Sequence, residues 1–310
     1  MIVRISDGEF MGIGEAAPSR YYGEDASSVL LALENVDKLL SKNPFELEAN
    51  LARLVSKLSG HPSARAAVDI ALHDLVCQRL RVSLSSFLGL DSLKIPITSF
   101  TIGIDKPSTI VSKVREALEY KALKVKLGSK QDLEIMHIIR NETDAQIRID
   151  ANGGWTVNQA VEMVNCLAEF GVELVEQPLP PGLPEDWLKV REAAPMPIFA
   201  DESVLTSSDI PAMAGLVDGV NIKLMKCGGI REALRVIHTA RAHGMKVMLG
   251  CMIESSVAIT AAAHLACLAD YIDLDGNLLI TNDKFVGARV DKGRIVLPDA
   301  PGIGVFSQLN

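Results

Sequence analysis

From about residue 95 onward, short apolar runs alternate with segments of helical periodicity. The segments between the runs, such as 108–120, 156–170, 230–243 and 255–268, space their apolar residues as one face of an α-helix does. Because the runs lack a regular polar alternation, they predict parallel strands that are covered on both faces. The eight runs fall at residues 98–102, 122–127, 146–150, 174–176, 198–200, 219–223, 246–250 and 271–274. The α/β pattern predicts a modified TIM barrel of (β/α)7β type.

Residues 1–92 have a different pattern. Two short apolar runs, 2–5 and 10–13, flank an Asp-Gly turn and predict a β-hairpin. An irregular segment, 14–25, is followed by three helical patterns at 26–40, 44–58 and 63–80. We therefore expect three parts. They are an N-terminal α+β capping domain over 1–92, a barrel over 93–281, and a C-terminal segment, 282–310, that returns to the cap.

Composition narrows the class of protein. A chain of 310 residues that is 48% hydrophobic can bury a large core, and its net charge of −8 without long runs of one sign argues against nucleic acid. Five cysteines without CxxC spacing suit a reducing compartment. The N-terminus has no signal-peptide pattern, and the most apolar helical window, 257–269, is too short to cross a bilayer. We expect a cytoplasmic protein with no membrane partner.

Charged residues follow almost every predicted strand, where a parallel barrel carries its chemistry. Asp150, Glu176 and Asp201 end the third, fourth and fifth strands, about one βα unit apart. Three converging carboxylates repel one another unless a cation neutralises them. Since no histidine or cysteine accompanies them, Mg²⁺ is favoured over Zn²⁺. The alternative is three separately solvated loop carboxylates.

Lysines supply the second element of the predicted site. Lys124 and Lys126 point to the same face of one strand, and with no acid between them their repulsion should depress the pKa of at least one. Lys223, which ends the sixth strand, should face Lys126 across the ring. Two such bases suit removal of a proton from one face of a carbon acid and its return to the other. A solvated strand edge is the alternative for the first pair. Lys226, one turn after Lys223, is interpreted as a loop lysine because its register places it beyond the strand, with a further candidate base as the alternative.

The motifs KVK, IDANGGW, VEQP, ADES, NIKLMKCGGI and GCMIESS, with GEAAPS and ARAAVDIALHDL in the cap, resemble the muconate-lactonizing subgroup of the enolase superfamily. The resemblance implies paired acid/bases at Lys126 and Lys223, with Lys124 tuning Lys126. It implies Mg²⁺ ligands at Asp150, Glu176 and Asp201, supported from the same loops by Asn152 and Glu202. Asn152, Met252 and Glu254 are candidate substrate contacts.

Asp273 and Asp275, at the end of the eighth strand, resemble the DxD that binds the substrate's free amino group in dipeptide epimerases. The resemblance implies a Mg²⁺-dependent enzyme that inverts the α-carbon of a dipeptide's C-terminal residue through a metal-stabilised enediolate. It also implies a homo-oligomer, as many relatives are. Alternatives are an N-acylamino-acid racemase, an enzyme like o-succinylbenzoate synthase or muconate cycloisomerase, and a non-catalytic barrel that binds a small acid. The plainest alternative for the DxD is a strand end followed by an Asp-Gly turn.

One departure from the family pattern concerns the start of the chain. Family members usually begin with an additional strand and a flexible loop over the active site, whereas Met1 lies in what resembles the second cap strand. We expect either a truncated start or a site that works without that loop. The 14–25 segment is then the candidate substrate-facing surface. Arg20 could meet a side-chain carboxylate, with an ordinary surface arginine as the alternative.

Overall fold

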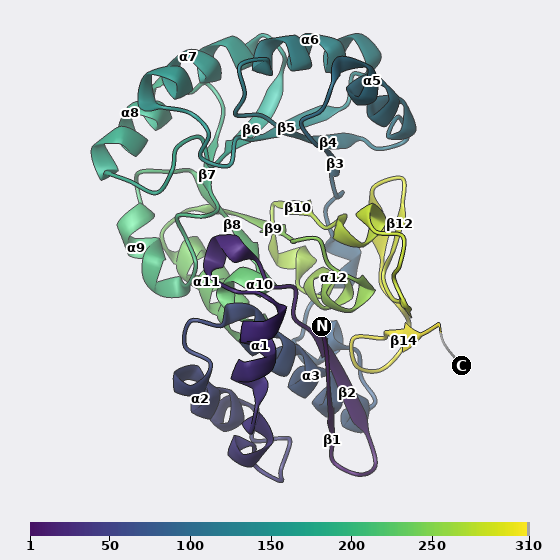
Figure 1. Ribbon diagram of the computed structural model, residues 1–310. Helices are drawn as coiled ribbons and strands as arrows, with labels where there is room; N and C mark the ends of the chain where they lie inside the picture. Colours follow the sequence, from purple (N-terminus) through teal and green to yellow (C-terminus); the bar gives the residue numbers. More distant parts are fainter. Residues whose placement is uncertain (309–310) are drawn as a thin grey trace.

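The computed structural model describes residues 1–308, so residues 309–310 of the predicted C-terminal segment lie outside it. Eight strands form one parallel sheet in which each strand pairs with the next along the chain, as the sequence predicts (Figure 1). The strands are β3 (Phe100–Ile102), β4 (Ala122–Lys126), β5 (Gln146–Asp150), β6 (Val172–Glu176), β7 (Ile198–Ala200), β8 (Gly219–Lys223), β9 (Lys246–Gly250) and β10 (Tyr271–Asp273). The predicted (β/α)7β barrel is confirmed.

Helical segments connect the barrel strands. They are α5 (Pro107–Glu116), α6 (Asp132–Glu142), α7 (Val157–Ala168), α8 (Pro184–Ala193), η4 (Ser207–Asp209) with α9 (Ile210–Met213), α10 (Leu224–Cys227) with α11 (Ile230–Ala242), and α12 (Ser256–Ala263) with η5 (Ala266–Leu268). The helix predicted over 255–268 therefore ends early, as two shorter pieces. The first and last strands meet at a seam, where Thr98 bridges Ile272 and the backbone N–H of Ser99 donates to the Ile272 carbonyl at 3.3 Å.

The N-terminal region contains β1 (Ile2–Ser6), β2 (Met11–Glu15), η1 (Arg20–Tyr22), α1 (Ala26–Leu33), η2 (Val36–Leu39), α2 (Leu47–Lys57), α3 (Pro62–Leu80), α4 (Leu84–Phe87) and η3 (Ser92–Lys94). The predicted hairpin is present, with Gly8 at φ 95° in its turn. The helix predicted over 26–40 is divided into α1 and η2, because Asn35 between them adopts a left-handed φ of 61°. Most of α3 is buried, since it lies between the hairpin and the barrel (Figure 1).

The β1–β2 hairpin packs on α3 through two glycines, Gly12 and Gly14. A Cβ added to Gly14 would lie 2.0 Å from the Ala67 carbonyl oxygen and 2.9 Å from the Ala71 nitrogen. Gly14→Ala should therefore lower the free energy of unfolding by about 3 kcal/mol, at the upper end for overpacking, measured by denaturant titration. Gly103→Ala, whose Cβ meets nothing within 4 Å, is the matched control. Equal stability of the two variants would contradict the close packing.

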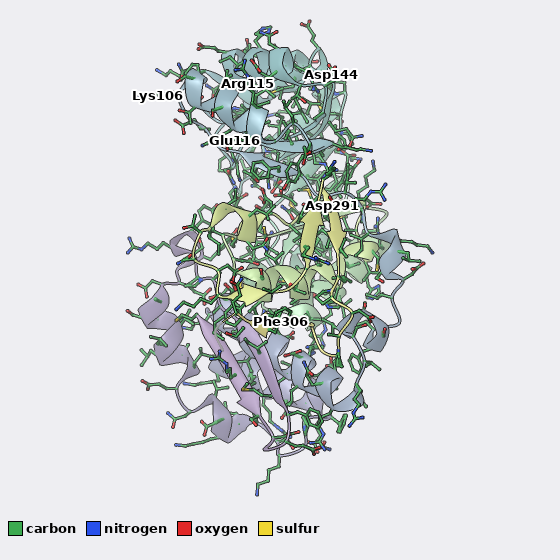
Figure 2. All side chains as sticks on the ribbon, turned by 90° about the vertical axis from the view of Figure 1, so that its right-hand side faces the viewer. Lys106, Arg115, Glu116, Asp144, Asp291 and Phe306 are labelled. Carbon is green, nitrogen blue, oxygen red and sulfur yellow. The ribbon has the colours of Figure 1, made fainter. Side chains whose placement is uncertain are left out.

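The C-terminal segment contains β11 (Phe285–Val286), β12 (Arg289–Asp291), β13 (Arg294–Val296) and β14 (Phe306–Ser307), after η6 (Gly276–Leu279). The β12–β13 hairpin reaches the barrel seam, where the Thr98 N–H donates to the Gly293 carbonyl at 2.8 Å; Figure 2 shows Asp291 at this boundary. Farther on, Asp74 of α3 accepts the N–H groups of Ile13 and Ile303, both at 2.8 Å. One buried carboxylate thus joins the N-terminal hairpin to the C-terminal segment.

His264 lies in the same junction. Its Nδ1 accepts the Ser85 N–H and its Nε2 faces the Ile303 carbonyl oxygen, each at 3.2 Å. Burial lowers the pKa of this ring from 6.5 to about 4. The unfolded chain therefore binds the additional proton between these two values, so the stability present above pH 6.5 is lost as the pH falls toward 4.

We expect this one histidine to account for a loss of roughly 3 kcal/mol across that window. His264→Gln should flatten the dependence of the unfolding free energy on pH, and the variant of exposed His243, His243→Gln, should not. Urea titrations at several pH values measure both. An unchanged slope in His264→Gln would contradict the assignment.

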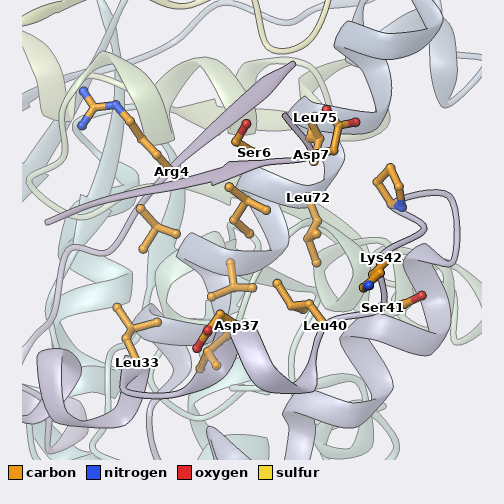
Figure 3. Close-up of a pocket in the computed structure, with 15 residues that line it drawn as sticks. Arg4, Ser6, Asp7, Leu33, Asp37, Leu40, Ser41, Lys42, Leu72 and Leu75 are labelled. Carbon is orange, nitrogen blue, oxygen red and sulfur yellow. The ribbon is translucent and has the colours of Figure 1, made fainter. Parts of the chain in front are cut away.

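A cavity of about 630 Å³ lies in the cap between β1, η2 and α3 (Figure 3). Aliphatic side chains, among them Leu33, Leu40, Leu72 and Leu75, form much of its wall. Within residues 1–308, β1 pairs with β2 alone, and β1 forms one side of this cavity. The cavity is thus lined by cap residues and not by the charged residues at the barrel strand ends. The described chain also contains no helix long and apolar enough to cross a membrane.

Candidate active site

Three buried carboxylates converge at the carboxyl ends of β5, β6 and β7. One oxygen from each of Asp150, Glu176 and Asp201 lies within 4.8 Å of the others, and each residue is at most 1% exposed. The strand register explains the convergence, because Asp150 pairs with Glu176 across neighbouring parallel strands. The structure thus brings the three predicted carboxylates together, and their all-oxygen donor set suits a hard divalent cation such as Mg²⁺.

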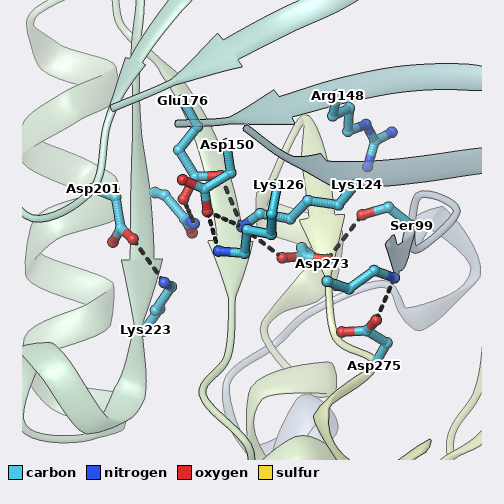
Figure 4. A network of polar contacts seen from close by, with 12 residues as sticks. Ser99, Lys124, Lys126, Arg148, Asp150, Glu176, Asp201, Lys223, Asp273 and Asp275 are labelled. Carbon is cyan, nitrogen blue, oxygen red and sulfur yellow. Dashed lines mark hydrogen bonds and ion pairs between the residues drawn. The ribbon is translucent and has the colours of Figure 1, made fainter. Parts of the chain in front are cut away.

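Lys124 lies among these acids. Its Nζ is 3.0 Å from Asp150 Oδ2, 2.9 Å from Glu176 Oε2 and 2.8 Å from Asp273 Oδ2 (Figure 4). Burial acts to lower the pKa of this lysine, but the surrounding carboxylates outweigh it and raise the pKa well above its usual value. The ammonium group is therefore held in its charged form.

The expectation that no acid separates Lys124 from Lys126 is wrong. Asp150 Oδ2 accepts from Lys126 Nζ at 2.6 Å as well as contacting Lys124. The cause is again register, since Lys126 pairs with Asp150 on the adjacent strand. Lys126 Nζ also donates to Asn152 Oδ1 at 3.0 Å, and Asn152 Nδ2 donates to Glu202 Oε1 at 3.0 Å. Lys126 is thus held by the loop that follows β5.

Lys223 approaches the cluster from the side of Asp201. Its Nζ donates to Asp201 Oδ2 at 2.7 Å (Figure 4). Burial acts to lower the pKa of Lys223, and the adjacent Asp201 carboxylate reverses this and raises it. Lys126 and Lys223 therefore contact different members of the same carboxylate cluster, with Asp150 on one side and Asp201 on the other.

Lys226 is not a loop lysine. It lies on α10, one turn after Lys223, and is 3% exposed. Its Nζ donates to the Asp201 carbonyl oxygen at 2.6 Å, to Asp201 Oδ1 at 2.7 Å and to the Asn221 carbonyl oxygen at 2.8 Å. The sequence signal that could have found it is its spacing of three from Lys223, which is one helical turn.

The predicted DxD lies at the barrel seam. Asp273 accepts from Ser99 Oγ at 2.9 Å through Oδ1, and Asp275 accepts the Thr101 N–H at 2.7 Å through Oδ2 (Figure 4). Burial and the neighbouring Asp273 raise the pKa of Asp275 to about 7. Two buried carboxylates side by side form a place where a cation lowers the local repulsion.

A cavity of about 420 Å³ joins the two lysine faces to the DxD. Its lining residues are Ser19, Tyr21, Tyr22, Thr101, Lys124, Lys126, Asn152, Glu202, Lys223, Cys251, Met252, Ile253, Asp273, Asp275, Gly276 and Leu279. The predicted candidates Asn152 and Met252 are among them. The cap segment 14–25 contributes through Ser19, Tyr21 and Tyr22, whereas Thr101, Cys251 and Leu279 were not predicted from sequence.

Two other predicted contacts lie elsewhere. Glu254 is buried beside the cavity, where its Oε1 accepts the Met252 N–H at 2.8 Å, and burial raises its pKa to about 8. It therefore shapes the loop that carries Met252. Arg20 is exposed and is not among the lining residues. Its contact with a substrate side chain stays a prediction.

The fold and these side chains are those of barrel enzymes that combine a cluster of carboxylates able to bind a cation with paired lysines. Residues 1–89 match the mandelate racemase/muconate lactonizing enzyme N-terminal domain, and residues 109–307 match the enolase C-terminal domain-like family. The chain belongs to the mandelate racemase/muconate lactonizing enzyme family of the enolase superfamily.

Relatives of known name share most of the chain. The L-Ala-D/L-Glu epimerase of Bacteroides thetaiotaomicron is 45% identical, over 95% of this chain and 78% of that protein. A dipeptide epimerase of Cytophaga hutchinsonii, solved with Mg and D-Ala-L-Val, superposes with a TM-score of 0.93 at 30% identity and covers 100% of this chain and 88% of that one. The N-succinyl Arg/Lys racemase of Bacillus cereus has a TM-score of 0.92 at 27% identity, over 99% and 87%.

Proposed function

We propose that this chain is a Mg²⁺-dependent dipeptide epimerase that inverts the α-carbon of the C-terminal residue by a two-base 1,1-proton transfer. The observation that carries the proposal is that the DxD and the two lysines Lys126 and Lys223 line one cavity above the carboxylate cluster. A dipeptide has the matching groups: a free ammonium, an acidic α-C–H and a carboxylate. The similarity to relatives named as dipeptide epimerases supports it.

The proton transfer is assigned to Lys126 and Lys223. In each turnover one neutral lysine accepts the α-proton, and the other, as an ammonium, donates a proton to the opposite face. Lys124 is not assigned as a base, because its Nζ contacts three carboxylates, those of Asp150, Glu176 and Asp273, whereas Lys223 contacts one, that of Asp201. Asp150, Glu176 and Asp201 would hold Mg²⁺, which would neutralise the charge that develops on the substrate carboxylate.

The substrate ammonium is assigned to Asp273 and Asp275. Charge-assisted hydrogen bonds from this ammonium to both carboxylates fix the dipeptide at the seam end of the cavity. Asn152 and Met252, which also line the cavity, are proposed substrate contacts, and Glu254 acts on the substrate through the Met252 loop.

An N-acylamino-acid racemase is the second candidate, and the likeness to the N-succinyl Arg/Lys racemase favours it. Its substrate carries no free ammonium, so the buried Asp273–Asp275 pair would then lack a cationic partner in the substrate. The two functions therefore differ in what the DxD contributes.

Removing the DxD charge tests the choice. Asp275→Asn should lower kcat/KM for free dipeptides on the order of 10- to 100-fold, the equivalent of one charged hydrogen bond. Turnover is read as the mass increase from solvent deuterium in a dipeptide library incubated in D₂O. Asp144→Asn, an exposed acid before β5, is the control. If the protein instead turned over N-acylated amino acids faster than dipeptides, and Asp275→Asn left that rate unchanged, the result would support the racemase.

We also propose the finer organisation expected from sequence: a cap over 1–92, a barrel over 93–281 and a return segment from 282, in a cytoplasmic homo-oligomer that binds no nucleic acid. A separate apolar cluster inside the cap, which includes Val29, Leu54 and Leu58, supports the division. Five free cysteines support a reducing compartment. The exposed Leu30 and Leu31 on α1 support a contact between copies.

A further inference from the structure

Lys226 has no direct access to a substrate. An ammonium group has three N–H donors, and all three are engaged, by the Asp201 carbonyl, Asp201 Oδ1 and the Asn221 carbonyl. The residue is 3% exposed and is absent from the wall of the active-site cavity. Any effect of Lys226 on the reaction must therefore pass through the groups that it holds.

Asp201 is divided between two lysines. Lys226 holds Oδ1 and Lys223 holds Oδ2, each at 2.7 Å. The Asp201 N–H donates to Gln177 Oε1 at 2.8 Å, which fixes the backbone as well. Among residues 1–308, Lys226 is the hydrogen-bond donor to Asp201 Oδ1. Without it, the carboxylate could rotate and Lys223 could bridge both oxygens.

The short helix that carries Lys226 is itself fixed by the cap. It ends at Cys227 and is followed by Gly228 and Gly229, with φ of 94° and 113°. A Cβ on Gly229 would lie 2.5 Å from Asp69 Cβ, and Asp69 Oδ1 of α3 accepts the Ile230 N–H at 2.8 Å. The position of Lys226 is therefore set by packing against α3 and not by the flexibility of a loop.

We propose that Lys226 is a positioning residue that orients Asp201 and thereby holds Lys223 at one face of the substrate α-carbon. The inference rests on the proposed two-base function. It concerns one base alone, because Lys126 is held by Asp150 and Asn152, which Lys226 does not contact. Loss of Lys226 should therefore affect the two faces of the substrate unequally.

The charge of Lys226 gives a second, separable consequence. Its ammonium lies against a proposed cation ligand, so its removal makes the cluster more negative. A divalent cation should then bind with equal or higher affinity, since one repulsive charge has gone. A general structural defect would instead weaken both cation binding and proton transfer.

The test compares Lys226→Met with the wild type in D₂O, using each epimer of one dipeptide separately. The variants Lys126→Ala and Lys223→Ala first identify which epimer exchanges its α-proton at which lysine. Lys226→Met should slow exchange of the Lys223-dependent epimer about 10- to 100-fold, as loss of a ligand-orienting partner does. Exchange of the other epimer should stay within about threefold.

Calorimetric titration with Mg²⁺ alone supplies a readout independent of turnover, with affinity expected to be equal or higher. Lys226→Gln, which keeps a donor to Asp201, should show the same asymmetry to a smaller degree and replaces the methionine variant if that fails to fold. Equal slowing of both epimers, no slowing, or loss of Mg²⁺ binding would each overturn the inference. A wild type that exchanges neither epimer would contradict the proposed function itself, and the inference with it.

Discussion

Lys223→Ala should lower epimerisation on the order of 10²- to 10⁴-fold, the contribution of a general acid–base group. Lys223 contacts Asp201 on one side of the cluster, and Lys126 contacts Asp150 on the other. Under the two-base proposal neither lysine should replace the other, because each is assigned to one face of the α-carbon. Lys126→Ala should have an effect of the same size.

The two variants should differ in what they retain. Each should still exchange the α-proton of the epimer that faces its remaining lysine, as read by mass spectrometry in D₂O. Lys246→Ala, at the exposed start of β9 and so at the other end of the barrel, is the control and should keep wild-type rates. Full epimerisation by either active-site variant would contradict the two-base proposal.

Removal of the cation should abolish turnover completely. Dialysis against a chelator leaves the charge on the substrate carboxylate without its neutralising partner, and added Mg²⁺ should restore the rate. Mg²⁺ at about 100 times its Kd should also raise the free energy of unfolding by about 2.7 kcal/mol, which thermal denaturation with and without Mg²⁺ measures.

Two glutamates of β6 give a matched pair for this experiment. Glu176→Gln should lose most of the Mg²⁺-dependent stabilisation, because it removes one of the three converging carboxylates. Glu173→Gln should retain it, since Glu173 pairs with Arg148 at 2.8 Å. An identical response of the two variants would exclude Glu176 as a cation ligand.

The barrel and the carboxylate cluster could be predicted from sequence because both depend on a repeat. Each βα unit returns the chain to the same end of the barrel, so residues that end successive strands become neighbours. The register Lys126–Asp150–Glu176 across three strands is the direct result. The same register also places Asp150 between Lys124 and Lys126. The sequence of β4 alone does not show this contact, because Asp150 belongs to the neighbouring strand.

Other features depend on individual contacts, and the spacing of residues along the chain does not identify the partners. Two of the three acceptors of Lys226 belong to Asp201, just after β7, and the third is the carbonyl of Asn221 in β8, and only the folded chain brings them together. The left-handed Asn35, which divides a predicted helix, has no distinct sequence pattern. Likewise, Tyr21 and Tyr22 line the cavity while Arg20 between Ser19 and Tyr21 does not, a difference set by the direction of each side chain.

The seam between β3 and β10 determines which part of the site can assemble last. Asp273 and Asp275 are anchored by Ser99 and Thr101, each 174 residues away along the chain. The three clustered carboxylates, by contrast, lie at the ends of three consecutive strands, β5, β6 and β7, in the middle of the barrel. During synthesis on the ribosome, an emerging chain that ends just after β7 already contains all three carboxylates of the proposed cation site, whereas the proposed pocket for the substrate ammonium forms only when the last strand joins the first.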